Sequence, residues 1–338
     1  MGIRNASIPS LLDVVTEVGA DGSAVYIAEI LTKASPMQDD MSWKVGNLVT
    51  GDRVQVRTGK PAVGFRRLNE GVARSKATSK PIDEAAALLE ASFQCDRELA
   101  ILGGDPAGYR KNQWPSFIEA MNDQFAETLV YGNSLFDDTQ FTGFMPRYNT
   151  LANDQVIDAG GIGTDNRSIL LVGWAPDKVT GIVPKNTTSG LQHIDATSNL
   201  RPHTDGFPIG DEITDGNGLT YLGYKDRWLW RCGLSIQDPR YVVRGCNIDF
   251  SALSKDLVSG ADLEDLMIQM EERIHTLTGV NAVFYAPREI ITMLRRQITY
   301  GRKTNASYGE VGGKRVLMFG ETPVRRLDAM NIDEARVV

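Results

Sequence analysis

The sequence predicts an α+β protein that carries a long, positively charged hairpin outside its core. Two observations predict the mixed fold: three segments place apolar residues at helical spacing, and the rest, above all after residue 150, resembles short strands separated by glycine-rich turns. The third observation is charge. Residues 53–80 hold eight basic side chains and one acid, a net charge of +7, whereas the chain of 338 residues carries −7, so the remainder carries −14.

Composition limits the class of protein. The length suits two domains or one elaborated domain, and 42% hydrophobic residues suffice for substantial cores. An isoelectric point near 5.2 argues against a primary nucleic-acid-binding protein. Three scattered cysteines are too few for a disulfide framework and favour a reducing compartment. No window approaches about 18 uninterrupted apolar residues, so we expect no membrane span.

The first 80 residues contain little that could form a core. Residues 1–42 have the pattern of an arm, in which short apolar groups alternate with glycines and prolines, and Val25 to Lys33 is a candidate helix. Residues 43–80 have the pattern of a long hairpin, because polar residues alternate with valines over 53–57 as on a strand with one polar face. We expect the turn at Gly59–Pro61 and the start of the return strand at 65–68.

The hairpin has two interpretations. It is either a solvated surface loop or a partner-binding segment, and long loops without a core of their own are usually functional or partner-bound. A basic extended segment on an acidic body needs an acidic surface, which another copy of the same chain would supply. We expect the following residues at contacts between copies: Trp43, Arg53, Arg57, Lys60, Phe65, Arg66, Arg67 and Leu68.

Downstream of the hairpin, we expect residues 87–100 to form a strand that runs into a short helix over 96–102. The clearest helix spans about 115–131, with Pro115 in its first turn and Gly132 at its end. Its apolar stripe recurs every four residues and indicates core packing: Phe117, Met121, Phe125 and Leu129.

After residue 150, strands predominate. Strands are predicted over 168–174, 179–184, 228–236, 241–248, 280–285, 316–319 and about 324–327, and residues 185–225 have the composition of a polar surface insertion. A second helix is predicted over about 261–277, where Ser259 and Asp262 match a capping box. A third helix is predicted to start at Pro287.

No constellation of residues predicts an enzyme or a metal site. The glycine-rich stretch 158–163 precedes a strand, whereas a dinucleotide loop follows one, and 309–315 lacks phosphate-loop spacing. The histidines His193, His203 and His275 lack zinc-site spacing, and we expect His193 and His203 to be ordinary surface residues. The polar cluster Asp211, Glu212, Asp215 and Asn217 lacks the order of a calcium loop, and no base is indicated for the thiol of Cys95. We therefore expect no catalytic residue, no cofactor and no metal.

Several segments, taken in order, are similar to one known family. They are Ser10–Val15, Trp43–Leu48, Tyr131–Asn133, Gly143–Asn149, Ile157–Gly161 and Gly190–His193. With the predicted order of elements, they make the chain resemble the major capsid proteins of tailed bacteriophages, which have the Hong Kong 97-type fold. Among these, it is most similar to the capsid proteins of short-tailed phages of the epsilon-fifteen type.

The resemblance implies an arrangement of segments along the chain. Residues 1–42 would be the N-terminal arm, 43–80 the extended loop, 81–150 the peripheral domain with its spine helix, 151–310 the axial domain, and 311–338 the C-terminal strands returning to the body. Some relatives begin with a long scaffolding segment, so the resemblance also implies a separate scaffolding protein or a segment removed in maturation. Some relatives cross-link a loop lysine, and Lys60 lies near that place, but we identify no matching acceptor.

The resemblance further implies a structural, non-enzymatic function. Copies would self-assemble into hexamers and pentamers that close an icosahedral virion shell around double-stranded DNA, without sequence-specific binding, in the cytoplasm of a bacterial host. The implied partners are further copies together with scaffolding, portal and decoration proteins, and no membrane. Two alternatives stay open: a soluble hydrolase with an unrecognised acidic site, and an encapsulin-like cellular compartment.

Overall fold

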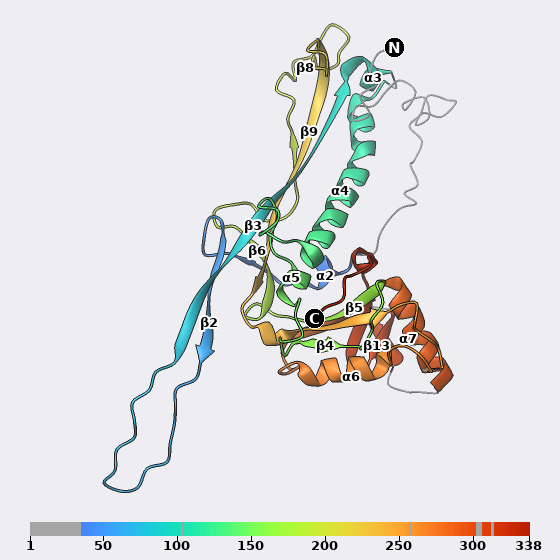
Figure 1. Ribbon diagram of the computed structural model, residues 1–338. Coiled ribbons are helices and arrows are strands. Elements are labelled where there is room, and N and C mark those ends of the chain that lie inside the picture. The colour runs from blue at the N-terminus through green and yellow to red at the C-terminus, as the bar shows by residue number, and fades with distance from the viewer. Residues whose placement is uncertain (1–34, 103, 257, 302–305, 312–313) are drawn as a thin grey trace. The chain divides into compact units, whose positions relative to one another are not determined.

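The computed structural model describes residues 35–338, except 103, 257, 302–305 and 312–313 (Figure 1). The predicted helix Val25–Lys33 and most of the predicted arm lie outside these residues. The described chain forms two compact units. Unit 1 contains Leu88–Phe125 and Ser189–Arg231, and unit 2 contains the residues up to Ala87 together with Ala126–Thr188 and Cys232–Val338.

Three elements contribute residues to both units: β3 (Thr78–Asp96), α4 (Pro106–Tyr131) and β9 (Thr220–Ile236). Unit 1 combines residues from two of the predicted ranges, because 189–231, expected in the axial domain, clusters with 88–125. The domain boundaries themselves stay a prediction.

A twisted sheet forms the body of unit 2. Its strands are β1 (Trp43–Val45), β2 (Gly51–Gly59), β4 (Val156–Asp158), β5 (Asn166–Trp174), β6 (Val179–Val183), β10 (Val242–Asp249), β11 (Asn281–Ala286), β12 (Ala306–Val311), β13 (Lys314–Phe319) and β14 (Thr322–Arg326). Hydrogen bonds connect them in the order β12-β13-β14-β11-β5-β6, and β10 pairs with both β5 and β4. All nine residues of β5 are buried, so this strand is the centre of the core. The predicted strand 168–174 is confirmed.

The helices of unit 2 are α2 (Met37–Asp40), α5 (Phe144–Arg147), α6 (Leu263–Arg273) and α7 (Arg288–Gly301), with short 3-10 helices at Pro239–Tyr241 and Asp328–Met330. The capping box expected at Ser259 and Asp262 is wrong. Asp262 is itself the N-cap, since its carboxylate accepts hydrogen bonds from the backbone N–H groups of Glu264 and Asp265, whereas the Ser259 hydroxyl donates to the Ala252 carbonyl. The helix ends four residues earlier than expected, because Ile274 already has extended backbone. Leu266 and Met270 of α6 pack on β10 at Gly245.

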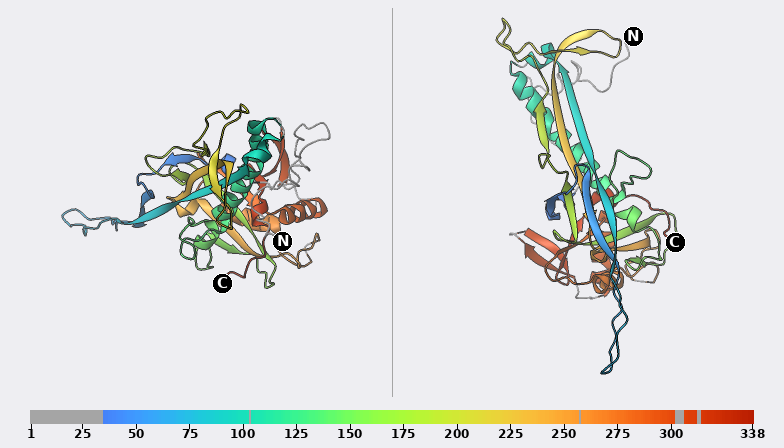
Figure 2. Two further views of the ribbon diagram at one scale, coloured as in Figure 1. Left: turned by 90° about the horizontal axis from the view of Figure 1, so that it is seen from above. Right: turned by 90° about the vertical axis from the view of Figure 1, so that its left-hand side faces the viewer.

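Unit 1 is built on long elements that run side by side. It holds residues 88–96 of β3, α3 (Arg97–Ile101), residues 106–125 of α4, β7 (Gln192–Asp195), β8 (Asp211–Thr214) and residues 220–231 of β9. Figures 1 and 2 show α4 running along β3 and β9. The Phe117 ring stacks on Trp228 at 4.7 Å between ring centroids and meets Phe93 at 5.6 Å. These contacts confirm the predicted core role of the Phe117 stripe.

Two expectations about unit 1 are wrong. The helix starts at Pro106 and keeps Pro115 in its interior. Its true start signal is Asp105, whose carboxylate accepts a hydrogen bond from the Gly108 N–H and so caps the first turn, where Pro106 needs no N–H partner. The polar stretch 185–225 is not simply an insertion, because β7 and β8 within it pair with β9.

Candidate inter-subunit surface

The candidate surface is a hairpin whose two strands belong to unit 2. Strand β2 pairs antiparallel with β3, placing Arg53 opposite Asp83 and Arg57 opposite Ser79. Between them lies a segment without regular structure, residues 60–77, which we call the basic loop. Its five cations are Lys60, Arg66, Arg67, Arg74 and Lys76, against one acid, Glu70.

The chain reverses farther out than predicted. The Glu70 N–H donates to the Arg67 carbonyl, and Asn69 adopts a φ of 68°, a left-handed conformation that asparagine tolerates in turns. Strand β2 runs through Gly59, so the turn expected at 59–61 is wrong. The return strand begins at Thr78, so residues 65–68 precede the reversal rather than follow it.

The base of the hairpin is anchored by two buried carboxylates. Asp52 lies 2.6 Å from the Lys44 Nζ and accepts a hydrogen bond from the Ser235 hydroxyl. Glu84 accepts two hydrogen bonds from the Arg147 guanidinium, of 2.7 and 2.6 Å. Both carboxylates are almost fully shielded from solvent. These contacts fix the base of the hairpin, at Asp52 and Glu84, to the rest of unit 2.

From residue 60 outward, the hairpin is not buried against any other part of the described chain. Every residue from 60 to 83 is exposed, and Figure 1 shows the hairpin, in blue, extending away from the rest of unit 2. Phe65 is 111% exposed and Leu68 91%. Fully exposed large apolar side chains at the end of a protein segment are typical of a surface that a partner covers.

Most of the charge on the hairpin is not neutralised within the described chain. Arg53 forms a two-pronged ion pair with Asp83, its partner across the ladder. Among the described residues, the other seven cations of 53–80 form no ion pair; Arg66 donates to the Glu70 carbonyl at 3.2 Å. The hairpin therefore presents a basic surface with an apolar tip.

The structure gathers seven of the eight predicted contact residues on the hairpin. Arg53 and Arg57 lie on β2, and Lys60, Phe65, Arg66, Arg67 and Leu68 lie on the basic loop. Trp43 does not join them. It lies on β1, which pairs with β6, and its ring covers Gly181, where an added Cβ would come within 2.8 Å of the indole.

A groove of about 630 Å³ in unit 2 follows the outer part of β2. It is lined by Val54–Lys60, Asp177, Lys178 and Gln237–Arg240. In the described sheet, β2 is the last strand of the path, with β3 as its strand partner. An edge strand beside a groove can accept an added strand from another chain. The sequence did not predict that residues 177–178 and 237–240 line this groove, because they lie in turns far from β2 in sequence and have no pattern that marks a binding site.

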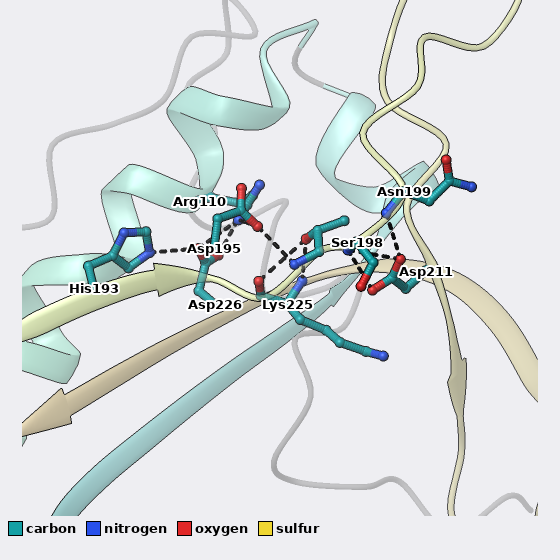
Figure 3. A network of polar contacts seen from close by, with 9 residues as sticks. Arg110, His193, Asp195, Ser198, Asn199, Asp211, Lys225 and Asp226 are labelled. Atoms are coloured by element: carbon teal, nitrogen blue, oxygen red, sulfur yellow. Dashed lines mark hydrogen bonds and ion pairs between the residues drawn. The ribbon is translucent and has the colours of Figure 1, made fainter.

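A second polar site, in unit 1, is structural (Figure 3). Fully buried Asp226 accepts hydrogen bonds of 2.7 and 2.6 Å from Arg110, which also lies 2.9 Å from Asp195. The His193 Nε2 lies 2.8 Å from the same Asp226 carboxylate, and its ring packs on Trp114. Although burial opposes it, the bonds to Asp226 and Asp195 raise the pKa of Arg110 above its ordinary value. His193 lies at the surface, as expected, but it also has a structural role through Asp226 and Trp114.

The other chemical candidates have structural roles too. Asp211 accepts backbone N–H bonds from Ser198 and Asn199 (Figure 3), and Asp215 accepts those of its own turn. Burial raises the pKa of the Cys95 thiol to about 12. Within the described residues, no group of three potential ligands that could hold a metal ion occurs. No described helix has the length and apolar character needed to cross a bilayer.

Comparison with known proteins agrees with this architecture. The model of the family "major capsid protein GP7" matches residues 19–338. A chain in a near-atomic structure of bacteriophage Epsilon15 is 26% identical, with a TM-score of 0.76, and the match covers 100% of both chains. No curated protein sequence matches significantly.

Two further structures are more distant. The bacteriophage JBD30 capsid is 10% identical with a TM-score of 0.48, covering 89% of this chain and 93% of that one. An encapsulin from Synechococcus elongatus PCC 7942 is 10% identical with a TM-score of 0.44, covering 74% and 97%. Likenesses this weak support no argument, and the comparisons favour neither the hydrolase nor the cellular compartment. The chain belongs to the major capsid protein GP7 family and has the Hong Kong 97-type fold of bacteriophage capsid proteins, which form the shell of the virion.

Proposed function

We propose that copies of this capsid protein assemble into hexamers and pentamers of an icosahedral head, and that the basic loop of each copy binds its neighbour. The head would enclose double-stranded DNA and assemble in the bacterial cytoplasm with scaffolding, portal and decoration proteins. Residues 1–42 would form the N-terminal arm. The observation that carries the proposal is the hairpin, which is fixed at its base and exposed from residue 60 to 83.

The two kinds of side chain on the basic loop would act differently. Burial of a side chain such as Phe65 or Leu68 contributes about 1.5–3 kcal/mol, whereas a single exposed ion pair contributes about 0–1 kcal/mol. The apolar tip would therefore supply most of the affinity. The cations would orient the loop on an acidic neighbour and reject a basic one. The anchored base lowers the cost of ordering, because less of the hairpin has to be immobilised on binding.

The arrangement suits ring assembly. A ring requires heterologous contacts, in which one patch of a copy meets a different patch of the next. The tip of the basic loop, with Phe65 and Leu68, and the groove beside β2 are different patches of one unit. We propose that strand addition at the β2 edge contributes to the contacts as well.

Charge reversal of Arg66 and Arg67 tests the proposal. The double variant Arg66→Glu, Arg67→Glu should fold, because neither side chain is buried or ion-paired within the described chain, but should not form shells. The matched control is Lys111→Glu, Arg201→Glu, which makes the same charge change at exposed residues of unit 1. Circular dichroism checks folding, and sedimentation with negative-stain imaging checks particles. Normal particles from the Arg66, Arg67 variant would refute the role of the loop.

Two further measurements distinguish electrostatic steering by the cations of the basic loop from anchoring by its apolar side chains. The assembly rate should fall with added salt, because the screening length shrinks from about 10 Å at 0.1 M to about 3 Å at 1 M. A rate that does not change with salt would exclude electrostatic steering. The variant Phe65→Ser, Leu68→Ser should instead weaken the final particles at every salt concentration, and unchanged particle stability would exclude the apolar anchor.

A further inference from the structure

A short loop of unit 2, between α4 and α5, exposes large apolar side chains that the fold does not use. It comprises residues 133–142, and we call it the acidic loop because its exposed middle carries Asp137 and Asp138. Leu135 is 90% exposed and Phe136 92%. Among the described large apolar residues, only five are at least 90% exposed, and the other three all lie on the basic loop, at positions 63, 65 and 68. Exposed apolar side chains of this kind are typical of surfaces that a partner covers.

The acidic loop is closed at its base. The Gly143 N–H donates to the Gly132 carbonyl at 2.8 Å, and the hydroxyl oxygens of Ser134 and Thr142 lie 2.7 Å apart. An added Cβ at Gly132 would come within 2.6 Å of the Phe141 carbonyl oxygen, so the two ends of the loop are in contact. Phe141 itself is buried. A compact surface loop with its ends together is an Ω-loop, a class of loop that is frequently functional.

Hydrogen bonds also order the exposed middle of the acidic loop. The Asn133 side chain accepts from the Leu135 N–H at 3.0 Å. The Asp137 carboxylate accepts from the N–H and the hydroxyl of Thr139, at 3.0 and 2.6 Å. Asp137 and Asp138 are both exposed, and neither forms an ion pair with another described residue. The loop therefore presents an apolar pair and two negative charges in an ordered conformation.

The acidic loop and the tip of the basic loop are complementary. Residues 65–68 (Phe-Arg-Arg-Leu) place two cations between two apolar side chains, and residues 135–138 (Leu-Phe-Asp-Asp) place two apolar side chains beside two carboxylates. If either loop met its own equivalent on another copy, like charges would come together, which is unfavourable. Contact between one loop and the other instead joins opposite charges and covers the apolar side chains of both. Such a contact is heterologous, as ring assembly requires.

The acidic loop lies near the base of the hairpin and not near its tip. Arg147, which binds Glu84 at the base, also donates to the Thr142 carbonyl at 3.0 Å and so ties the acidic loop to that base. The tip extends away from the base (Figure 1). At about 3.3 Å per residue, the chain from Asp52 to Arg67 reaches up to about 50 Å. Since the basic loop is not buried against the described part of its own chain, the acidic loop of another copy is the one that it can cover.

We infer that the acidic loop of one copy is the surface that binds the tip of the basic loop of the next copy. The inference rests on the proposed function, in which the basic loop binds a neighbour, and adds which surface of the neighbour is bound. The apolar side chains of the two loops pack together, while Asp137 and Asp138 pair with Arg66 and Arg67. Repeated from copy to copy, this head-to-tail contact builds a ring.

Exchange of charge between the two loops tests the inference. The variant Asp137→Arg, Asp138→Arg should lose its shells, as Arg66→Glu, Arg67→Glu should. The variant that combines all four changes should form shells again, because opposite charges then face each other once more. Asp138→Arg alone, which removes no hydrogen bond of the loop, replaces the double change if circular dichroism shows that the double change disturbs the fold.

The outcomes separate this inference from the proposed function. The control Asp154→Arg, Glu212→Arg makes the same charge change at exposed acids elsewhere and should keep its shells. Normal shells from the acidic-loop variant, or no recovery in the combined variant, would overturn the inference and leave the proposed role of the basic loop intact. Normal shells from Arg66→Glu, Arg67→Glu would count against that role itself. Sedimentation and negative-stain imaging provide the readout.

Cross-linking gives a second readout that does not depend on charge. The variant Leu68→Cys, Phe136→Cys, treated with a short bifunctional maleimide and then denatured, should give a ladder of species larger than dimers, because each copy offers one thiol in each direction. Each single variant should stay monomeric. Burial raises the pKa of the Cys95 and Cys232 thiols to about 12 and that of Cys246 to about 11, so the native thiols should not react. Dimers from a single variant, or no ladder from the double variant, would contradict the inference. The ladder decides the contact in oligomers smaller than a shell as well.

Discussion

Asp83 and Glu84 are neighbours on β3. Replacing each in turn by its amide compares the contribution of a buried ion pair, at Glu84, with that of an exposed one, at Asp83. Glu84 is 6% exposed and binds Arg147 through two short hydrogen bonds, whereas Asp83 is exposed and pairs with exposed Arg53. The two variants Glu84→Gln and Asp83→Asn make the same chemical change one residue apart. They therefore test whether burial or the ion pair as such holds the base of the hairpin.

The expected cost follows from what remains around Arg147. Removing one partner of a buried ion pair costs about 3–5 kcal/mol, because the other charge stays buried and uncompensated. Arg147 is 21% exposed and keeps hydrogen bonds to the carbonyls of Thr142 and Gly143. We therefore expect a smaller cost for Glu84→Gln, about 2–3 kcal/mol, or about 30- to 150-fold in the local unfolding equilibrium. Asp83→Asn should change little, because its pair is solvated.

Hydrogen exchange read by mass spectrometry on peptides spanning 78–87 measures this local free energy directly. A global melting curve is less suitable, because the chain has two compact units and need not unfold in one step. Equal exchange rates for the two variants would refute the reasoning. The double variant Glu84→Leu, Arg147→Met should recover much of the loss, since apolar replacement of both partners leaves no buried charge.

Three other predictions concern groups away from the hairpin. Glu334→Gln should cost about 3–5 kcal/mol, because it leaves buried Arg244 without its carboxylate partner, and unchanged exchange protection of the C-terminal segment would contradict this. The hydrogen bond from Arg97 holds the pKa of Asp205 below its ordinary value of 3.8. The stability that the ionised Asp205 contributes to the fold is therefore complete above pH 3.8 and is lost as the pH falls through the lower pKa of the folded state. The variant Arg97→Gln should remove this part of the acid dependence of the melting temperature, and an unaltered acid profile would count against the prediction. Burial raises the pKa of Cys232 to about 12, so a thiol reagent at pH 8 should leave it unmodified until denaturant is added, and rapid labelling of the native protein would show the thiol to be accessible.

Charged side chains at the base of the hairpin and on the basic loop differ in whether they have partners within the described chain. Buried carboxylates such as Asp52 and Glu84 meet cations and hydroxyls of their own unit, and they fix the hairpin base. Among the described residues, the cations of the basic loop form no ion pair, and the hairpin's own pair, Arg53 with Asp83, lies on its strands. Charges that hold the hairpin base are therefore paired internally, whereas charges available for partners lie on an extended segment.

The sequence by itself determined the features that depend on neighbours along the chain. Alternation over 53–57 predicted β2, the apolar run 168–174 predicted β5, and apolar residues at helical spacing predicted α6, since each signal is a local pattern of burial. The charge of +7 on residues 53–80 and the resemblance to capsid proteins needed no coordinates either. These features were enough to place seven of the eight candidate contact residues on one exposed hairpin.

Tertiary structure alone decided what depends on distant pairing. The basic loop has no core and no regular pattern, so nothing local marked its reversal at Arg67–Glu70 rather than at Gly59. Asp226 meets Arg110 across 116 positions of sequence and His193 across 33, and β7 becomes a strand by pairing with β9. The groove beside β2 is likewise formed by separate segments, because such a concave surface arises only when folding brings them together.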